Sequence, residues 1–498
     1  MKLRIPRPRL RVSQGESAFA AGNARWTNHD LDPIAKNARR WGVLSIIEPS
    51  AYWISDALQA ATWQFASGMI AVGLTYREAL GIVALSFFII SLVISANGAV
   101  GAIYHVPFPV IARASWGFWG SYIAIISRVI LAVFWFAIQN VNGGNAVRVM
   151  LGAIWPSYLD IPNHIPESQG ITTNGMVGLL LFWLLQVPFL CMHPDKLRWL
   201  FTVKSILVPI SWLAILQILY IPMLPAVFTF FSFIGIAASS AGQIHYNLES
   251  IPWDPMVLIS YWPNRACRFF GAASFVLAAL GVNISANSLS AANDFNALAP
   301  RYINLRRGQL LCAVLSWCLV PWKILASAGN FLNFMSAYAV FLGPIAAIMM
   351  FDFWVVNRRR YDSLALYQPN NPTYRYTFTI PGFAKTISGT NWRAVVAFVV
   401  GVAPCIPGLI KSVNSHIDVG VGMHPFEFGW LLGFVATSIV YVLLSWLFPA
   451  KETQVDRAVL PDEIYDGGTV DGLESDDPDR KGVVTDTQEK DMDVEKAV

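Results

Sequence analysis

The chain has 498 residues, of which 55% are hydrophobic and only 13% charged, and its mean hydropathy is +0.49. These values exclude an ordinary soluble globular protein, in which about 25% of residues are charged. The net charge of +4 conceals an asymmetry, because residues 451–498 hold 15 Asp or Glu against 6 Lys or Arg.

Residues 1–49 form a polar N-terminal arm that contains Lys2, Arg4, Arg7, Arg9 and Arg11. Basic residues ahead of a first span favour retention on the cytoplasmic side. The first apolar run begins only near residue 50, after this polar segment, which argues against a cleavable signal peptide. We therefore expect a multi-pass protein with a cytoplasmic N-terminus, placed in the plasma membrane.

Apolar runs long enough to cross a bilayer recur from residue 50 to residue 449. They predict an all-α polytopic membrane domain with about 11 spans, near residues 50–74, 77–103, 119–143, 173–193, 199–217, 218–243, 266–293, 308–326, 329–355, 391–411 and 426–449. The acidic segment 450–498 then reads as a disordered cytoplasmic tail, a possible target of trafficking or ubiquitination machinery.

The basic loops contradict this count of spans. If the N-terminus is inside, Arg113 and the pair Lys196 and Arg198 fall inside as the rule for positive charges requires. The basic stretches 301–307 and 358–360 follow seven and nine spans and would lie outside. Either a span between residues 199 and 243 re-enters the membrane, or the chain lacks a helix near residue 217.

Two amides lie inside one apolar run, since Asn283 and Asn287 are four residues apart and share a helical face. Unpaired amides are costly within a bilayer, so they face a cavity, a partner helix or a ligand. Hydrogen bonding between helices and a solute site both remain open on spacing alone.

An intramembrane enzyme is disfavoured, because the seven histidines and five cysteines show no metal-ligand, disulfide or nucleophile–base spacing. No cofactor, no metal and no nucleic-acid partner are expected; membrane lipid is the expected surrounding.

Several motifs resemble the nucleobase–cation symport family, specifically its fungal branch of uracil, allantoin and uridine permeases. The resemblance covers about residues 25–450 and rests on segments 28–33 (NHDLDP), 52–57 (YWISDA), 104–109 (YHVPFP), 135–139 (WFAIQ), 281–294, 302–308 (YINLRRG) and 334–344. It implies a five-plus-five inverted-repeat fold with two added helices and broken first and sixth helices. We expect the sixth helix to be missing here, because 202–205, similar to helix five, leads directly to 228–237, similar to helix seven.

The resemblance implies that Trp135, Gln139 and Asn287 bind a flat heteroaromatic solute, with Asn283 as support or a secondary contact. An indole can stack on such a solute, and amides can pair with its edge. From the residues alone, core packing or lipid contact for Trp135 and interhelical bonding for Gln139 are alternatives.

Gly68 and Gly73 suit either an unwound segment with free carbonyls or close helix packing. Met335, Ser336 and Leu342 align with the family's gating helix, or are ordinary packing residues.

The coupling ion is expected to be a proton. Gly281 and Val282 stand where sodium-coupled relatives place hydroxyl side chains, so a sodium site is disfavoured. Asp294 and Asp56 flank spans and are the candidate titrating groups, with a salt bridge or a helix cap as the alternative.

The prediction is a proton-coupled importer of uracil, allantoin or a related solute that works by alternating access. A non-transporting sensor or an inactive variant is the alternative, and low activity is expected if helix six is missing.

Overall fold

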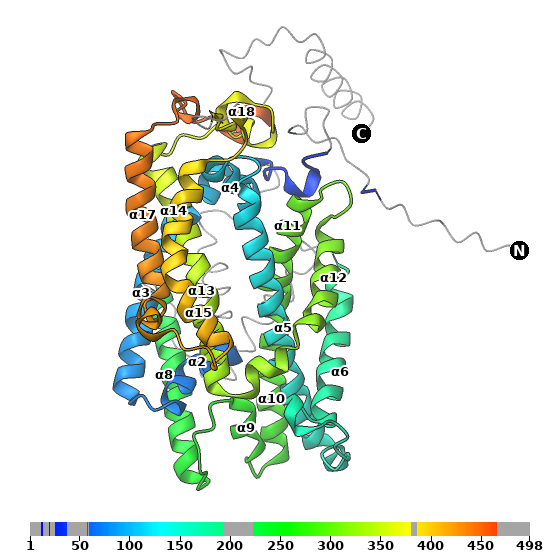
Figure 1. Cartoon of the computed structure of the whole chain (residues 1–498). Coiled ribbons are helices and arrows are strands. Elements are labelled where there is room, and N and C mark those ends of the chain that lie inside the picture. Colours follow the sequence, from blue (N-terminus) through cyan, green and yellow to red (C-terminus); the bar gives the residue numbers. More distant parts are fainter. Residues whose placement is uncertain are drawn as a thin grey trace, which may run out of the picture.

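The computed structural model describes residues 11–12, 19, 25–36, 57, 59–192, 223–379 and 386–465. Over this part the chain is a bundle of long helices that run roughly side by side (Figure 1). The predicted coupling residue Asp56 and the predicted span 199–217 lie outside the described residues.

Eight helical segments of the described chain are long and apolar enough to cross a membrane, and each falls on a predicted span. They comprise α3 (Tyr76–Tyr104), α5 (Ser121–Ile154), α6 (Thr173–Leu190), α8 (Met223–His245), α10 (Arg265–Val282) continued by η7 (Asn283–Ser288) and α11 (Leu289–Leu298), α13 (Ala328–Phe351) continued by η10 (Asp352–Val356), α14 (Trp392–Val402) continued by α15 (Ile406–Val413), and α17 (Gly429–Leu447).

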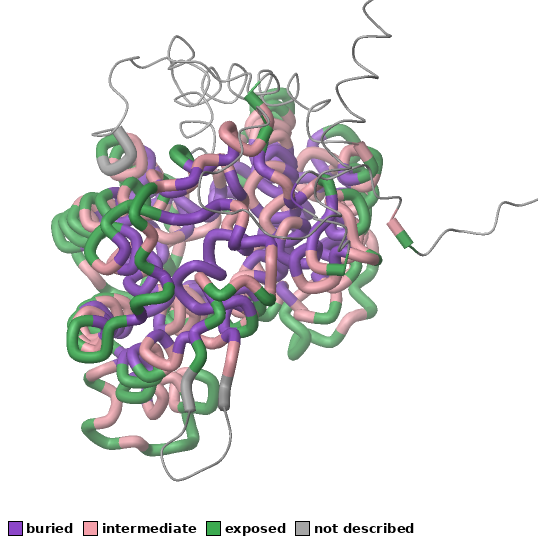
Figure 2. The backbone as a smooth tube through the Cα atoms, turned by 90° about the horizontal axis from the view of Figure 1, so that it is seen from above, coloured by how far each residue is buried: buried purple, intermediate pink, exposed green. Residues whose placement is uncertain are grey.

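Shorter elements connect these helices. They are η1 (His29–Leu31), α2 (Ala60–Ala71), α4 (Phe108–Trp116), α9 (Pro255–Ser260), α12 (Leu305–Leu315), η9 (Pro321–Ala326), α16 (His424–Glu427), η15 (Lys451–Thr453), α18 (Pro461–Tyr465) and the antiparallel strands β1 (Phe378–Thr379) and β2 (Thr386–Ile387). Seen along the bundle, buried residues gather in its middle and exposed ones form its outline (Figure 2). Large apolar side chains are exposed on the outside of the long helices, as on α3 at Leu85, Phe88 and Leu92, which suits contact with lipid.

The predicted span 308–326 is not one helix. The α-helix α12 ends at Leu315, and Val320 has a left-handed backbone (φ 48°) immediately before Pro321. Proline disfavours the α conformation in the residue before it and removes a backbone donor, so the segment continues only as short 3₁₀ turns.

Both described ends of the chain lie on one face of the bundle, together with the basic loops. Asn28 donates to Asn296 (2.7 Å), and the Tyr465 hydroxyl donates to the carbonyl of Pro33 (2.7 Å). Arg360 reaches the carbonyl of Asp456 (2.9 Å). We call this the terminal face and define it by residues 28–33, 113, 301–307, 357–376 and 451–465.

The first part of the acidic tail therefore differs from the prediction. Residues 451–465 pack on the terminal face, where Thr453 is buried and Val459 pairs with Asp362. The apolar and hydroxyl side chains in this stretch supply contacts that the charge count of the whole tail conceals.

The direction of α8 follows from its contacts with α3. Helix α3 ends at the terminal face; Phe228 of α8 stacks on Phe87 (4.4 Å), whereas the later residue Ile236 packs near Val83 and Ala79. Helix α8 is thus antiparallel to α3 and runs away from the terminal face. Helix α6 runs toward that face, because its later residues meet earlier residues of α5: Leu179 packs on Gly144, and Gln186 donates to Asn140. The predicted span 199–217 between these two helices lies outside the described residues.

Candidate functional site

Helices α5 and α6 and the π-helical segment η7 bring the predicted Asn283 and Asn287 into one buried network with Asn140 and Gln186. Asn287 donates to Asn283 Oδ1 (2.9 Å), and Asn283 donates to Asn140 Oδ1 (3.0 Å) and to Gln186 Oε1 (2.8 Å). Gln186 in turn donates to Asn140 (2.7 Å). These bonds satisfy amides that would be costly in an apolar bundle. Asn283 bonds to three of the other groups in this network and lies at its centre.

Asn287 is the member of this network with spare bonding capacity. Its side chain is 9% exposed, whereas Asn283 is 0% exposed. The segment η7 is a π-helix, and π-bulges within α-helices are frequent at functional sites. The wider turn keeps the two asparagines in direct contact, as their spacing predicted.

Gln139 lies one turn beyond Trp135 on α5 and is fully buried. Its Nε2 donates to Gln59 Oε1, while its own Oε1 has no hydrogen-bond partner. A buried amide oxygen without a partner costs about 1–3 kcal/mol, which a ligand donor would offset. The Oε1 atom of Gln139 is therefore free to accept a further hydrogen bond.

Gln59 is a site residue that sequence reasoning did not single out. It precedes α2 in an extended conformation (φ −141°), so the helix starts at Ala60 beside Gln139. The signal in the sequence was an amide within an apolar run, the same signal that drew attention to Asn283 and Asn287.

The predicted unwound segment at Gly68 and Gly73 is not observed. Helix α2 continues through Gly68 to Ala71, and the carbonyls of Gly68 and Ile70 accept from Val72 and Gly73 (both 3.1 Å). A Cβ added at Gly68 would meet Ala328 of α13 at 3.8 Å, an ordinary contact distance, so the packing of α2 on α13 does not require a glycine here. Gly73 has φ +110° and ends the helix, because left-handed backbone is readily accessible to glycine.

Trp135 faces α13 rather than the amide network. Its ring makes edge contacts with Phe334 (6.3 Å) and Tyr338 (6.2 Å). The predicted gate residue Met335 packs in the same cluster, Ser336 is exposed, and Leu342 lies further along α13. The three gate residues therefore share a helix with the aromatic contacts of Trp135.

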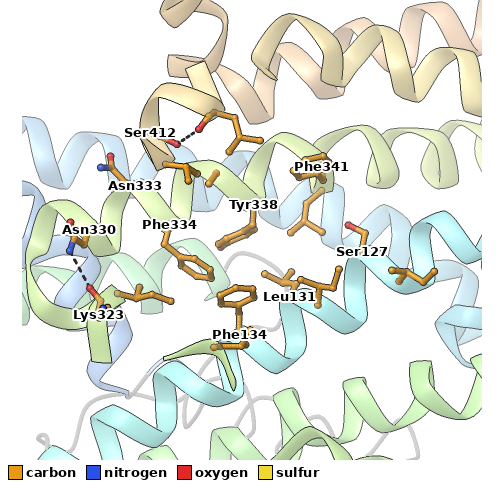
Figure 3. A pocket seen from close by; sticks show the side chains of 18 of the residues that line it. Ser127, Leu131, Phe134, Lys323, Asn330, Asn333, Phe334, Tyr338, Phe341 and Ser412 are labelled. Carbon is orange, nitrogen blue, oxygen red and sulfur yellow. Dashed lines mark hydrogen bonds between the residues drawn. The ribbon is translucent and has the colours of Figure 1, made fainter. Parts of the chain in front are cut away.

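A cavity of about 970 Å³ opens on the α13 side of this cluster (Figure 3). Phe134, Phe334 and Tyr338 point toward its middle from α5 and α13, and Leu131 and Phe341 extend its apolar wall. Its lining includes Phe334 and Tyr338 but not Trp135, Gln139 or Asn287. The aromatic cluster thus separates an open apolar cavity from the closed amide network.

The candidate coupling residue Asp294 forms a buried ion pair. Arg128 of α5 donates to both carboxylate oxygens, through Nε (2.6 Å) and Nη2 (2.5 Å), and its guanidinium also covers Phe108 (3.7 Å). Bidentate, charge-assisted bonds are the strong class of hydrogen bond. The structure therefore shows the salt-bridge alternative for Asp294, and proton transfer there would have to break it.

Arg113 is the buried cation of the terminal face. It donates to the carbonyls of Leu366 (3.0 Å) and Trp26 (3.4 Å), and burial lowers its pKa to about 10. The side chain stays charged at neutral pH and ties α4 to the N-terminal segment.

Comparisons with known proteins place this geometry in a class. Residues 33–218 and 215–433 match the family described as permeases for cytosine/purines, uracil, thiamine and allantoin. The allantoin permease of Saccharomyces cerevisiae is 30% identical, with 86% of this chain and 77% of that protein covered. The uracil permease of the same yeast is 28% identical, over 87% and 78%.

A solved structure shows the same fold. Mhp1, a nucleobase-cation-symport-1 family transporter held closed with bromovinylhydantoin, superposes with a TM-score of 0.62 at 17% identity, covering 89% of this chain and 99% of that one.

Fold and relatives together define a multi-pass membrane transporter. The chain belongs to the family of permeases for cytosine/purines, uracil, thiamine and allantoin, within the nucleobase–cation symporters. It is a transporter and not an enzyme. The two matched segments, 33–218 and 215–433, overlap at 215–218.

Proposed function

We propose that the protein is a proton-coupled symporter that imports uracil, allantoin or a related nucleobase-type solute across the plasma membrane by alternating access. The main support is Gln139, a fully buried amide whose Oε1 lacks a partner, one turn from Trp135 and next to Gln59. A flat solute between the indole and these amides would stack on the ring and pair with the free oxygen.

The closed amide network and the separate cavity suit alternating access. Solute from the cavity would reach Gln139 only when the cluster of Trp135, Phe334 and Tyr338 rearranges, which makes α13 the moving wall. Gating of this kind lets a solute be bound on one side and released on the other. The names of the relatives, allantoin permease and uracil permease, support the solute class.

We further propose that loss of a helix between α6 and α8 lowers the rate of transport but leaves the choice of solute unchanged. The amides of the site come from Gln59 before α2, from α5 and from η7, all outside that part of the chain. Solute binding would therefore persist while turnover is slow.

The test is uptake of labelled uracil and allantoin at pH 5.5 and 7.5 in permease-deficient cells that carry this chain with a surface tag. We expect slow, acid-stimulated uptake that Asn287→Ala abolishes. Uptake at the rate of an intact relative would contradict the effect of the missing helix, and uptake independent of pH would contradict proton coupling.

Solute binding to the purified protein distinguishes a defect in the binding site from a defect in transport. Gln139→Ala should weaken solute binding by about 2- to 10-fold, the worth of one neutral hydrogen bond. Asn97→Ala is the matched control, since this amide bonds to Val93 and Ala346 (3.2 and 3.3 Å) outside the site. Absence of binding by the wild-type chain would remove the proposal altogether.

A further inference from the structure

A second buried carboxylate, Asp352, lies at the terminal-face end of α13, where the helix changes to the π-helical turn η10. Its side chain accepts from the hydroxyls of Tyr361 (2.6 Å) and Tyr441 (2.6 Å) and from Asn357 Nδ2 (3.0 Å). The residue is 1% exposed. Three neutral donors thus converge on one carboxylate. Tyr441 comes from α17, Tyr361 from the segment 357–376, and Asn357 from the end of η10.

The groups around Asp352 bring no cation to it. No ion pair found among the described residues includes Asp352. Tyr441 comes from α17, and the segment 357–376 supplies further titratable groups nearby. These are Tyr361, Tyr374, Tyr376 and Asp362, while Arg393 of α14 and Glu452 act on Tyr376. Asp362 is engaged by the backbone N–H groups of Leu364 (2.9 Å) and Ala365 (3.1 Å).

Ser115 of α4 can accept a hydrogen bond from Asp352 when this residue is protonated. Its hydroxyl is fully buried beside Asp352 and has no other hydrogen-bond partner among the described residues. The ionised carboxylate uses its three donors, whereas a protonated carboxyl carries one O–H that needs an acceptor. Ser115 Oγ can accept that O–H, so both protonation states can be satisfied.

We propose that Asp352 is a proton-binding site that latches α13 to α17 and to the terminal face. Hydronium transfers a proton to one carboxylate oxygen: one O–H bond of hydronium breaks, the O–H bond of a neutral carboxyl group forms, and water is released. Burial in the latched state disfavours the charged carboxylate more than the neutral carboxyl, because the charge loses its hydration. Protonation therefore closes the latch, and deprotonation loosens it.

The latch acts on the helix that faces the candidate site. Helix α13 carries Phe334 and Tyr338 against Trp135, and the same helix continues into η10 at Asp352. Release at the terminal face would free this end of α13 to move. The link to coupling rests on the proposed proton symport, whereas proton binding at Asp352 does not.

Hydrogen exchange on the purified full chain in lipid nanodiscs tests the site without any solute. Peptides from 357–376 are compared at pH 5.5 and 7.5 after correction for the intrinsic effect of pH on exchange. We expect about tenfold faster exchange at the higher pH, the effect of a one-unit difference in proton affinity between the latched and released states. Asp352→Asn, which mimics the neutral carboxyl, should exchange slowly at both values, and the control Asp362→Asn should keep the difference.

A wild-type chain without the difference, or an Asp352→Asn chain that retains it, would overturn the proposal. If Asp352→Asn does not fold, Tyr441→Phe replaces it. Loss of one donor to the charged form should move the midpoint of the exchange transition upward by about one pH unit, and an unmoved midpoint would also overturn the proposal. A clear latch response in a chain that neither binds nor takes up solute would refute the symport and leave the proton site standing.

Discussion

The two buried carboxylates Asp294 and Asp352 are stabilised by different partners. Both are at most 1% exposed within membrane-spanning segments. Asp294 is neutralised by Arg128 in a bidentate pair, whereas Asp352 is held by two tyrosine hydroxyls and one amide. An ion pair binds its carboxylate in one charge state, while neutral donors leave the charge free to change. The comparison separates a structural bond from a site that can exchange a proton.

The largest expected effect comes from removing the cation of the first pair. Arg128→Met leaves Asp294 buried without a counter-charge, and this should lower the free energy of unfolding by about 3–5 kcal/mol. Denaturant unfolding in detergent measures the change. Arg128→Met combined with Asp294→Asn should recover most of the loss, and a double variant as unstable as the single one would show that packing, not charge, is responsible.

Asp352→Asn should cost less. The amide oxygen still accepts from Tyr361 or Tyr441, so the expected loss is at most about 1 kcal/mol, the worth of a typical hydrogen bond. The same unfolding measurement at neutral pH compares it directly with Arg128→Met. A loss as large as that of Arg128→Met would indicate that Asp352 has a counter-charge after all.

The two tyrosines provide a finer comparison within the latch. Tyr361→Phe removes a bond that ties the terminal face to α13, and Tyr441→Phe removes one that ties α17 to it. Tyr361→Phe should speed exchange in 357–376, whereas Tyr441→Phe should speed it in α17. The reverse pattern would contradict the assignment of the two bonds.

The smallest effect is expected at the ring under Arg128. Phe108→Leu keeps an apolar side chain but removes the face on which the guanidinium lies at 3.7 Å. The loss should be about 0.5–1 kcal/mol for this partly exposed contact. Phe118→Leu, which lies under Arg113 instead, is the matched variant at the second buried cation. Equal stability of Phe108→Leu and the wild type would show that the contact between the Arg128 guanidinium and the aromatic ring does not contribute to stability.

Much of the fold was predictable because apolar length is a strong signal in a bilayer. The spans 77–103, 329–355 and 426–449 lie close to α3, α13 with η10, and α17. The signal fails where a helix is interrupted, as at Val320 before Pro321, because hydropathy is unaffected by a change of backbone conformation.

The candidate site was predictable in part. Trp135 and Gln139 lie one turn apart on α5, and Asn283 and Asn287 bond to each other, as their spacing indicated. Gln59 was missed because its partner, Gln139, is 80 residues away. Asp352 was missed for the same reason, since Tyr441 is 89 residues further along the chain.

The sequence by itself determined that the chain is a helical membrane transporter, since the length of its apolar runs and its family motifs do not depend on how the helices pack. Only the tertiary structure decided which polar groups meet. It brought the basic loops to one face, gave Asp294 an arginine and left Asp352 among neutral donors. The physical reason is that spacing along one helix specifies a shared face, whereas partners across helices depend on the direction and depth at which those helices pack.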